Sequence, residues 1–227
     1  MTDNSCIRIG HLKIIDHLVL GVSDLIIQDH PDVFPSHLFE IFDMNSLDQV
    51  SESLVSGETS GAFLPAPLAM HLASIGLGIR IIMFANRAGS VIITPAAGSG
   101  DTVAGFRNRS VLVPSERSVE AMLLHRFLAA AGMEFGAHST PGADVMWETV
   151  PPSVMHEMIS LDEDADIGGA AVPEPYASIA VNNGIARELC TTSSLWKSHP
   201  GNVFVLSNTV LQNRADDVDS LISVFIK

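Results

Sequence analysis

The sequence predicts an α/β fold made of two related lobes, and a repeated segment is the main reason. Residues 61–70 read GAFLPAPLAM and residues 169–178 read GAAVPEPYAS, an offset of 169 minus 61, or 108 residues. In both copies a short apolar run precedes Pro-x-Pro, after which a helical pattern begins. The preceding segments, 38–63 and 145–171, also correspond as strand, loop, helix, acidic turn and strand. Two similar α/β lobes that face each other form a cleft, and such a cleft binds a ligand.

Length and composition agree with this organisation. A chain of 227 residues can form one large domain or two of about 110 residues, and 47% hydrophobic with 17% charged residues is typical of a globular protein. The net charge of -14, with only 12 lysines and arginines, argues against binding to nucleic-acid phosphates. No run approaches the roughly 20 apolar residues that a membrane span needs, so we expect no membrane insertion.

Apolar runs and helical spacing predict the elements of the first lobe. Leu47, Val50 and Leu54 recur on one helix face, and two prolines, Pro65 and Pro67, end the buried strand that follows that helix. The expected strands are Ile7–Gly10, Leu38–Phe42, Ala62–Leu64, Ile79–Phe84 and Ser90–Thr94, and the expected helices are Leu18–Ile27, Ser46–Ser56 and Leu68–Ile75. The last of these strands is expected to carry the chain toward the second lobe.

A polar segment rich in glycine and serine, PAAGSGDTVAGFRNRS at 95–110, resembles a linker and places the boundary between the lobes near Pro95. Lobe I is therefore expected to comprise residues 1–94 and 203–227, and lobe II residues 95–202. The β-rich run NVFVLS at 202–207 is expected to return the chain to lobe I. Two crossings of this kind would form a hinge.

The second lobe repeats the pattern of the first. Ser115 or Ser118 can cap an amphipathic helix whose apolar stripe begins at Val119, and Gly132 ends that helix. The other expected strands are Val111–Val113, Val145–Thr149 and Ile167–Val172, and the other expected helices are Val154–Ile159 and Tyr176–Asn183.

Ligands of open α/β sheets bind beyond the carboxyl ends of the strands. Four predicted loops follow strands in this way, at residues 11–17, 65–67, 115–118 and 173–176. The loop at 115–118 is the best candidate for holding an anion, because Ser115, Ser118 and Arg117 accompany the free N–H groups of a helix start. The alternative is that one serine is only a helix cap and that Arg117 is a solvated surface charge.

Three further residues are candidate ligand contacts. Glu174 stands between two prolines and would be held rigidly, although an acid at a helix start can also serve the helix dipole alone. Tyr176, the only tyrosine, could contact a ligand or pack within the protein. His11 directly follows the first strand and could donate a hydrogen bond to an anionic ligand.

The sequence offers no positive sign of catalysis or of a metal. The spacing of His11, His17, His30 and His37 fits no zinc pattern, and Cys6 and Cys190 form no CxxC pair. No GxSxG, GxxxxGK[ST] or HExxH motif occurs. We therefore expect no catalytic residue, no cofactor and no metal.

A run in the second lobe resembles a known family. Residues 164–207 contain Glu174-Pro175, then Trp196 and then His199-Pro200 before a crossing strand, a pattern similar to that of the nitrate/sulfonate/taurine substrate-binding proteins of ABC transporters, which are grouped with the THI5-like and NMT1-type proteins. The opening IRIGHLKIIDHLVLGV and the segments RAGSVIIT and VAGFRNRSVLVPSERS are similar too. The resemblance thus covers nearly the whole chain.

The resemblance implies a type 2 periplasmic-binding-protein clamshell, in which two α/β lobes joined by two crossing strands close around a small ligand. That ligand would be a small anionic or organic solute of the nitrate, sulfonate, bicarbonate or pyrimidine-precursor class, and an ABC permease would be the partner. By position, the contacts carried over are His11, Leu12, Pro65, Ala66, Ser115, Ser118 and Glu174.

The resemblance also implies a periplasmic or cell-surface location. The first twenty residues show no signal-peptide pattern, which would place a complete chain in the cytoplasm. Two alternatives to transport stay open on the same fold. One is a cytosolic enzyme similar to the chorismate dehydratase of menaquinone synthesis, and the other is a sensor that binds a ligand without transporting it.

Overall fold

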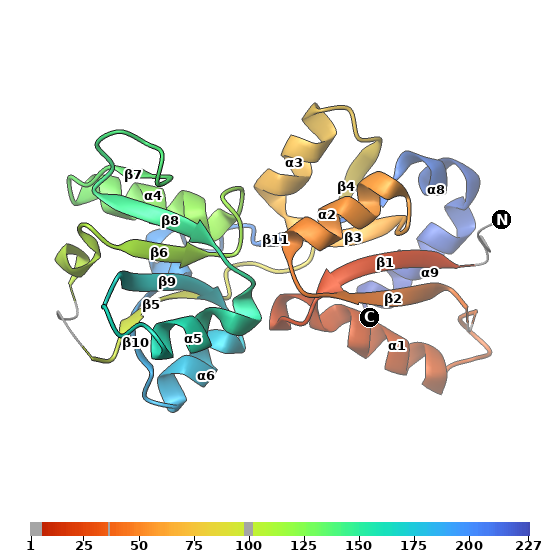
Figure 1. The fold of residues 1–227 in the computed structure, drawn as a ribbon. Helices are drawn as coiled ribbons and strands as arrows, with labels where there is room; N and C mark the ends of the chain where they lie inside the picture. Colours follow the sequence, from red (N-terminus) through yellow and green to blue (C-terminus); the bar gives the residue numbers. More distant parts are fainter. Residues whose placement is uncertain (1–5, 36, 98–101) are drawn as a thin grey trace. The chain divides into compact units, whose positions relative to one another are not determined.

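The computed structural model describes residues 6–35, 37–97 and 102–227. It divides into two compact units, each with its own sheet and helices (Figure 1). Unit 1 comprises Met1–Asn86 and Gly201–Lys227, and unit 2 comprises Arg87–Pro200. The expected α/β class is confirmed in both units.

Unit 1 contains a five-stranded sheet in the order β2-β1-β3-β11-β4. The three strands β1, β2 and β3 are parallel, whereas β11 is antiparallel to both of its neighbours, β3 and β4. The strands are β1 (Ile7–Leu12), β2 (Phe39–Met44), β3 (Gly61–Pro65), β4 (Ile79–Phe84) and β11 (Asn202–Ser207). Because β11 lies beyond the second crossing, the sheet is completed by a distant part of the chain.

Both faces of this sheet are buried, and the alternation of side chains shows why. On β3, Phe63 packs with one core while Ala62 and Leu64 pack with another, as the two-residue period of a strand requires. Helices α1 and α9 contribute to the first core, and α2 and α3 to the second. The helical elements of unit 1 are η1 (Ile15–His17), α1 (Leu18–Asp29), α2 (Leu47–Ser56), α3 (Ala66–Ser74), α8 (Asn208–Asn213) and α9 (Ala215–Phe225).

Unit 2 contains a six-stranded sheet in the order β10-β5-β9-β6-β8-β7. Here β6, β7, β8 and β9 are parallel, and β5 is antiparallel to both β9 and β10. The strands are β5 (Ser90–Pro95), β6 (Ser110–Val113), β7 (Phe135–Gly136), β8 (Val145–Thr149), β9 (Ile167–Pro173) and β10 (Ala186–Thr191).

Helices also cover both faces of the second sheet. Val111 and Ala171 pack with α4 in one core, while Leu112 and Val172 pack with α5 and α6 in the other. The helical elements of unit 2 are η2 (Val103–Phe106), α4 (Val119–Ala130), α5 (Pro152–Ser160), α6 (Tyr176–Asn182) and α7 (Thr192–Leu195).

The repeat seen in the sequence corresponds to equivalent strands. In unit 1, β3 lies between parallel β1 and antiparallel β11, and in unit 2, β9 lies between parallel β6 and antiparallel β5. Both copies of the repeat have a glycine at the same position, Gly61 and Gly169, and the close approach of a neighbouring strand explains both. A Cβ on Gly61 would lie 3.1 Å from the Val205 oxygen of β11, and one on Gly169 would lie 2.4 Å from the Ile93 oxygen of β5. The antiparallel neighbour thus leaves little room for a Cβ on Gly61 and none for one on Gly169.

Several details differ from expectation, and β7, α7, α8 and α9 form where no element was expected. The first unit ends at Asn86 rather than at residue 94, because Ser90–Pro95 pairs with β9 and β10 in the sheet of unit 2. The segment after β11 forms two helices, and α9 packs on the core of unit 1. Strand β10 follows α6 where no strand was expected.

Residues 98–101 of the expected linker lie outside the described residues. Of the helices in the described ranges, none combines the length and the apolarity that crossing a membrane takes.

Candidate functional site

The carboxyl ends of the parallel strands of unit 2 bring several predicted residues to one edge of its sheet. The loop 115–118 follows β6, Glu174 follows β9, and Thr192 follows β10. Ser90 begins antiparallel β5 at this same edge, opposite Pro173. We call this set of residues, together with Glu120 of α4, the unit 2 edge.

The two serines of the loop 115–118 are buried and partly engaged. The Ser118 hydroxyl caps α4 by accepting from the Ala121 N–H at 3.1 Å, and the Ser115 hydroxyl accepts from the Arg117 N–H at 3.2 Å. The guanidinium of Arg117 is paired with Glu116. The structure therefore shows the capping role for Ser118. Each serine O–H keeps a proton that can be donated to a ligand, and ligand contact stays a prediction.

Glu120 was not anticipated as a site residue. Its side chain is only 7% exposed, and its Oε1 accepts a hydrogen bond of 2.6 Å from the Ser90 hydroxyl. The Ser90 carbonyl in turn accepts from the hydroxyl of Thr192 at 2.9 Å, and both of these residues are buried. In the sequence, Glu120 is only an acid in the first turn of a helix, a common and purely electrostatic placement. Nothing in the sequence connects it with a serine thirty residues earlier.

Glu174 and Tyr176 both have partners within unit 2. The Glu174 carboxylate accepts from the N–H of Ser178 at 3.0 Å and from its hydroxyl at 2.9 Å, so it caps α6. The peptide bond before Pro175 is cis. The Tyr176 ring stacks on His156 of α5, with 6.5 Å between ring centres and an angle of 12°. The structure thus gives both residues the packing or capping role that the sequence left open beside ligand contact.

In unit 1, His11 and Lys13 at the end of β1 share one carboxylate. His11 Nε2 lies 2.9 Å from Asp43 Oδ1, and Lys13 Nζ lies 2.8 Å from Asp43 Oδ2. The Lys13 hydrogen bond, and after it that of His11, lowers the pKa of Asp43. His11 Nδ1 also lies 2.7 Å from the Leu12 carbonyl oxygen. Both ring nitrogens of His11 therefore already face acceptors.

A buried polar cluster of Asp16, His17 and Asn202 lies beside His11, whose ring centre is 5.9 Å from that of His17. Asp16 Oδ2 accepts from the Asn202 side chain at 2.8 Å, and the Asn202 N–H donates to Asn86 Oδ1 at 2.7 Å. Burial, with a smaller contribution from His11, lowers the pKa of His17 from 6.5 to about 3. His17 is therefore a neutral ring at physiological pH, which contacts Phe63 with 5.1 Å between ring centres.

The second predicted loop of unit 1, at 65–67, follows β3, and β3 pairs with the strand β11 that carries Asn202. Pro65, at the end of β3, is the register partner of Asn202, and it precedes the first residue of α3. The Ala66 N–H donates to the Gly201 carbonyl at 3.2 Å. The predicted residues of unit 1 thus lie at the carboxyl edge of its sheet, whereas those of unit 2 lie at the corresponding edge of the other sheet.

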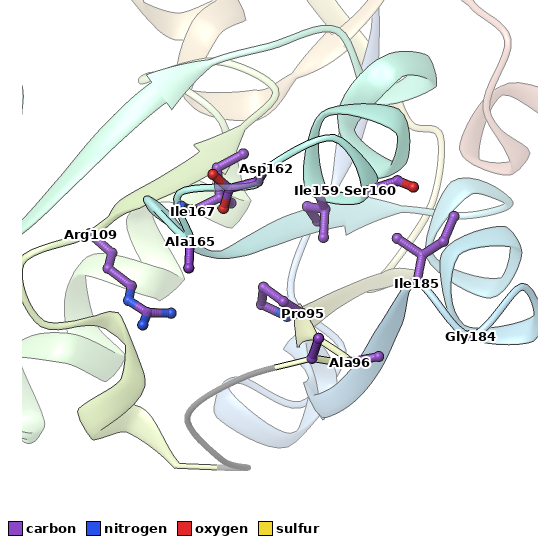
Figure 2. A pocket seen from close by; sticks show the side chains of 11 residues that line it. Pro95, Ala96, Arg109, Ile159, Ser160, Asp162, Ala165, Ile167, Gly184 and Ile185 are labelled. Carbon is purple, nitrogen blue, oxygen red and sulfur yellow. Dashed lines mark hydrogen bonds between the residues drawn. The ribbon is translucent and has the colours of Figure 1, made fainter.

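A hollow of about 550 Å³ lies at the opposite edge of the unit 2 sheet, near the amino ends of β6 and β9 (Figure 2). Arg109, Ile159 and Ile185 are among its lining residues, and none of the predicted site residues is. Both oxygens of Asp162 accept from backbone N–H groups, those of Asp166 and Ile167. None of the residues that line this hollow belongs to the unit 2 edge.

Across the described ranges, no three His, Cys, Asp or Glu side chains are grouped so that they could hold a metal ion. The candidate ligand-binding groups described above are hydroxyls, carboxylates and backbone groups at strand ends. Such groups can hold a small polar molecule by hydrogen bonds.

Solved structures share this fold. The ligand-binding component of an ABC-type import system from Staphylococcus aureus, with zinc bound, matches with a TM-score of 0.84 and 20% identity, over 98% of this chain and 72% of that one. The alkanesulfonate-binding protein SsuA of Xanthomonas axonopodis pv. citri, bound to MOPS, matches with a TM-score of 0.78 and 17% identity, over 99% and 73%. The periplasmic nitrate-binding protein NrtA of Synechocystis matches with a TM-score of 0.77 and 21% identity, over 97% and 60%.

Sequence comparison leads to the same group of proteins. The nitrate/nitrite binding protein NrtA of Synechocystis is 29% identical over 161 residues, which cover 71% of this chain and 32% of NrtA. The chain thus spans about a third of the length of this relative. The NMT1-like family matches residues 5–227, nearly the whole sequence, and the chain therefore belongs to that family.

Proposed function

We propose that this protein is the solute-binding component of an ABC-type importer and that it delivers a small polar solute to a membrane permease. The solute would be of the nitrate, sulfonate, bicarbonate or pyrimidine-precursor kind. The relatives named above are binding proteins, and two of them carry nitrate or alkanesulfonate in their names. The observation that carries the proposal is the group of buried hydroxyls and one carboxylate at the unit 2 edge, where ligands of α/β sheets bind.

Among the predicted contacts, the geometry favours Ser115 and Ser118. Each hydroxyl accepts a backbone hydrogen bond, which leaves its O–H proton available to donate to a solute. His11, Leu12, Pro65 and Ala66 remain proposed contacts from unit 1. Arg117, Glu174 and Tyr176 also remain proposed contacts, although each would have to leave or share its partner within unit 2 to touch a solute.

The test is a thermal-shift screen of the purified chain, followed by calorimetry. Nitrate, bicarbonate, a sulfonate and an aminopyrimidine represent the proposed classes. A ligand at a hundred times its Kd stabilises the folded state by about 2.7 kcal/mol, which for this chain length raises Tm by about 5–10 °C. The proposal fails if no compound in these classes changes the melting temperature.

A matched pair of variants tests the site. Ser115→Ala removes a proposed donor at the unit 2 edge, and we expect it to weaken binding by about tenfold, the effect of one lost hydrogen bond. Arg109→Gln alters the hollow at the opposite edge and should leave binding unchanged. Equal effects of the two substitutions would place the solute elsewhere.

The proposed partner and location need separate measurements. A permease that accepts this protein should show ATP-dependent uptake in vesicles only when the protein and its solute are both present. The proposed periplasmic or cell-surface location predicts that the protein is recovered in the exported fraction of its native cells. Recovery in the cytosolic fraction alone would favour the enzyme or sensor alternative on the same fold.

A further inference from the structure

We infer that a hollow at one edge of the unit 1 sheet binds a doubly charged tetrahedral oxyanion, namely inorganic phosphate, sulfate or the phosphoryl group of a small ester, through Arg8 and Arg214. This hollow, which we call the Arg8 hollow, has a volume of about 340 Å³. It lies at the amino ends of β1 and β3, whereas the predicted solute contacts of unit 1 lie at the carboxyl edge of the same sheet. This second site does not depend on the proposed solute binding.

Distant parts of the chain form the wall of the Arg8 hollow. Arg8 comes from β1, Ser60 directly precedes β3, Ser207 ends β11, and Arg214 follows α8. Two guanidiniums and four hydroxyls are among the lining groups, and of the described residues that line the hollow none is Asp or Glu. The wall therefore offers N–H and O–H donors and two positive charges, but no carboxylate.

Arg8 places a full positive charge at this wall. Its Nη2 donates to the carbonyl oxygen of Gly57 at 2.9 Å, and Gly57 also lines the hollow. A guanidinium has five N–H donors and stays protonated in proteins, so this one bond leaves most of its donors and all of its charge. Within the described part of the chain, no carboxylate forms an ion pair with Arg8. Its charge is therefore available to an anion.

Arg214 lies near the same point. Its Nε donates to Asp217 Oδ2 at 2.8 Å, a contact that holds the side chain in place, and Asp217 is not among the lining residues. Burial, and after it Glu40, raises the pKa of the Cys6 thiol, whereas Arg214 and Arg8 act to lower that pKa. Charges shift a pKa only at short range, so both guanidiniums lie near this one thiol. Cys6 itself lines the hollow.

The charge of this wall differs from that of the chain as a whole. The sequence has 12 lysines and arginines against 26 acids. A hollow of about 490 Å³ elsewhere in unit 1 is lined by Asp43, Glu52 and Glu58 and by no lysine or arginine, and the hollow of unit 2 has both Arg109 and Asp162 in its lining. Because salt screens charges beyond about 8 Å, the nearby guanidiniums decide the sign of the Arg8 hollow.

Two guanidiniums favour a tetrahedral dianion over a planar monoanion. Each can present parallel N–H donors to two oxygens of one anion, and a tetrahedral oxyanion has oxygens in more than one plane to meet both. At the same distance a dianion is attracted about twice as strongly as a monoanion. Leu54 and Val210 also line the hollow, and its volume suits a small organic ligand. An ester of phosphate therefore fits as well as the free ion.

The experiment is titration calorimetry on the full chain at pH 8 and constant ionic strength. The probes are inorganic phosphate, sulfate and phenyl phosphate, with acetate as the monoanion. We expect one of the three dianions to bind with one molecule per chain, and acetate to bind at least tenfold more weakly. Tighter binding of phenyl phosphate than of inorganic phosphate would identify an ester as the ligand, and the reverse order would identify the free ion.

Four variants locate the bound dianion. Arg8→Gln should weaken binding at least tenfold, the effect of a lost charge-assisted hydrogen bond, and Arg8→Lys, which keeps only the charge, should have a smaller effect. Thr209→Glu adds a negative charge at an exposed position of the wall and should also weaken binding at least tenfold. Arg109→Gln is the matched control, because it removes one positive charge from the hollow of unit 2, and it should leave binding unchanged.

Three results would overturn the inference. Equal weakening by Arg8→Gln and Arg109→Gln would show a non-specific attraction to charge. Weakening by Ser115→Ala but not by Arg8→Gln would place the dianion at the unit 2 edge. If none of the three dianions binds, the site does not exist, and the proposed solute binding still stands or falls by its own screen. Should Arg8→Gln not fold, Thr209→Glu decides, because it retains the bond between Arg8 and Gly57.

Discussion

Protonation of His17 should make the stability of this protein fall as the pH drops below 6.5. The ring is buried, and burial lowers its pKa from 6.5 to about 3. Because the folded-state pKa is depressed, the unfolded chain binds a proton at this residue well before the folded chain does. The contribution is fully present above pH 6.5 and is lost progressively toward pH 3. At 1.36 kcal/mol per pH unit, the loss between pH 7.5 and pH 5.0 is about 2 kcal/mol.

Urea unfolding at these two pH values measures the effect. The free energy of unfolding of the unmodified chain should fall by about 2 kcal/mol more than that of His17→Gln, in which the titrating group is absent. His37→Gln, at an exposed position, should behave like the unmodified chain. Equal pH-dependent losses in the unmodified chain and His17→Gln would refute the reasoning, because another group would then be responsible. A direct titration of the His17 ring in the folded chain that gave an ordinary pKa would also refute the reasoning.

Three further predictions concern stability and reactivity. Glu174→Ala removes the cap of α6 and should lower the free energy of unfolding by about 1 kcal/mol in a urea titration, and an unchanged midpoint would contradict the capping role. Gly169→Ala would place a Cβ 2.4 Å from the Ile93 oxygen and should cost about 1–3 kcal/mol in the same assay, whereas a neutral result would mean that β5 moves freely. Burial raises the pKa of Cys6 and Cys190, so at pH 7.5 iodoacetamide should alkylate both more slowly in the folded chain than in urea, a difference that mass spectrometry can detect or disprove.

The parts of the fold that depend on local pattern could be predicted from the sequence. The run GAFLP is a fully buried strand in the structure, and Leu47, Val50 and Leu54 do form the buried face of a helix. The strand at 90–95 was also recognisable. Its place in the unit 2 sheet could not be predicted, because an apolar run alone does not show which strands it will pair with.

Two of the missed elements, α9 and β10, were missed for different reasons. Val218, Leu221 and Val224 of α9 are buried at helical spacing, but they come after the second crossing, where the repeat gives no guide. In β10 an irregularity between Glu188 and Cys190 interrupts the alternation that would have shown a strand. The sequence thus carries the helical period of α9, whereas in β10 the strand period itself is broken.

The candidate site likewise has features that the sequence predicted and features that it could not. A cap at Ser118 and a helix-starting acid at Glu174 were both among the readings that the sequence allowed, and the structure shows these roles. The contact between Ser90 and Glu120 could not be foreseen, because it joins the first residue of β5 to the first turn of α4 across the sheet. Such contacts depend on tertiary structure alone.

The order in which the strands are joined has a consequence for synthesis on the ribosome. Unit 2 is one continuous stretch, but among the described strands β4 of unit 1 pairs only with β11, which begins at Asn202. Strands β3 and β4 are thus synthesised before β11 and have open edges until it follows, and unit 2 can fold before that gap is filled. Until then another chain could pair with the open edges, which exposes this stage of synthesis to aggregation.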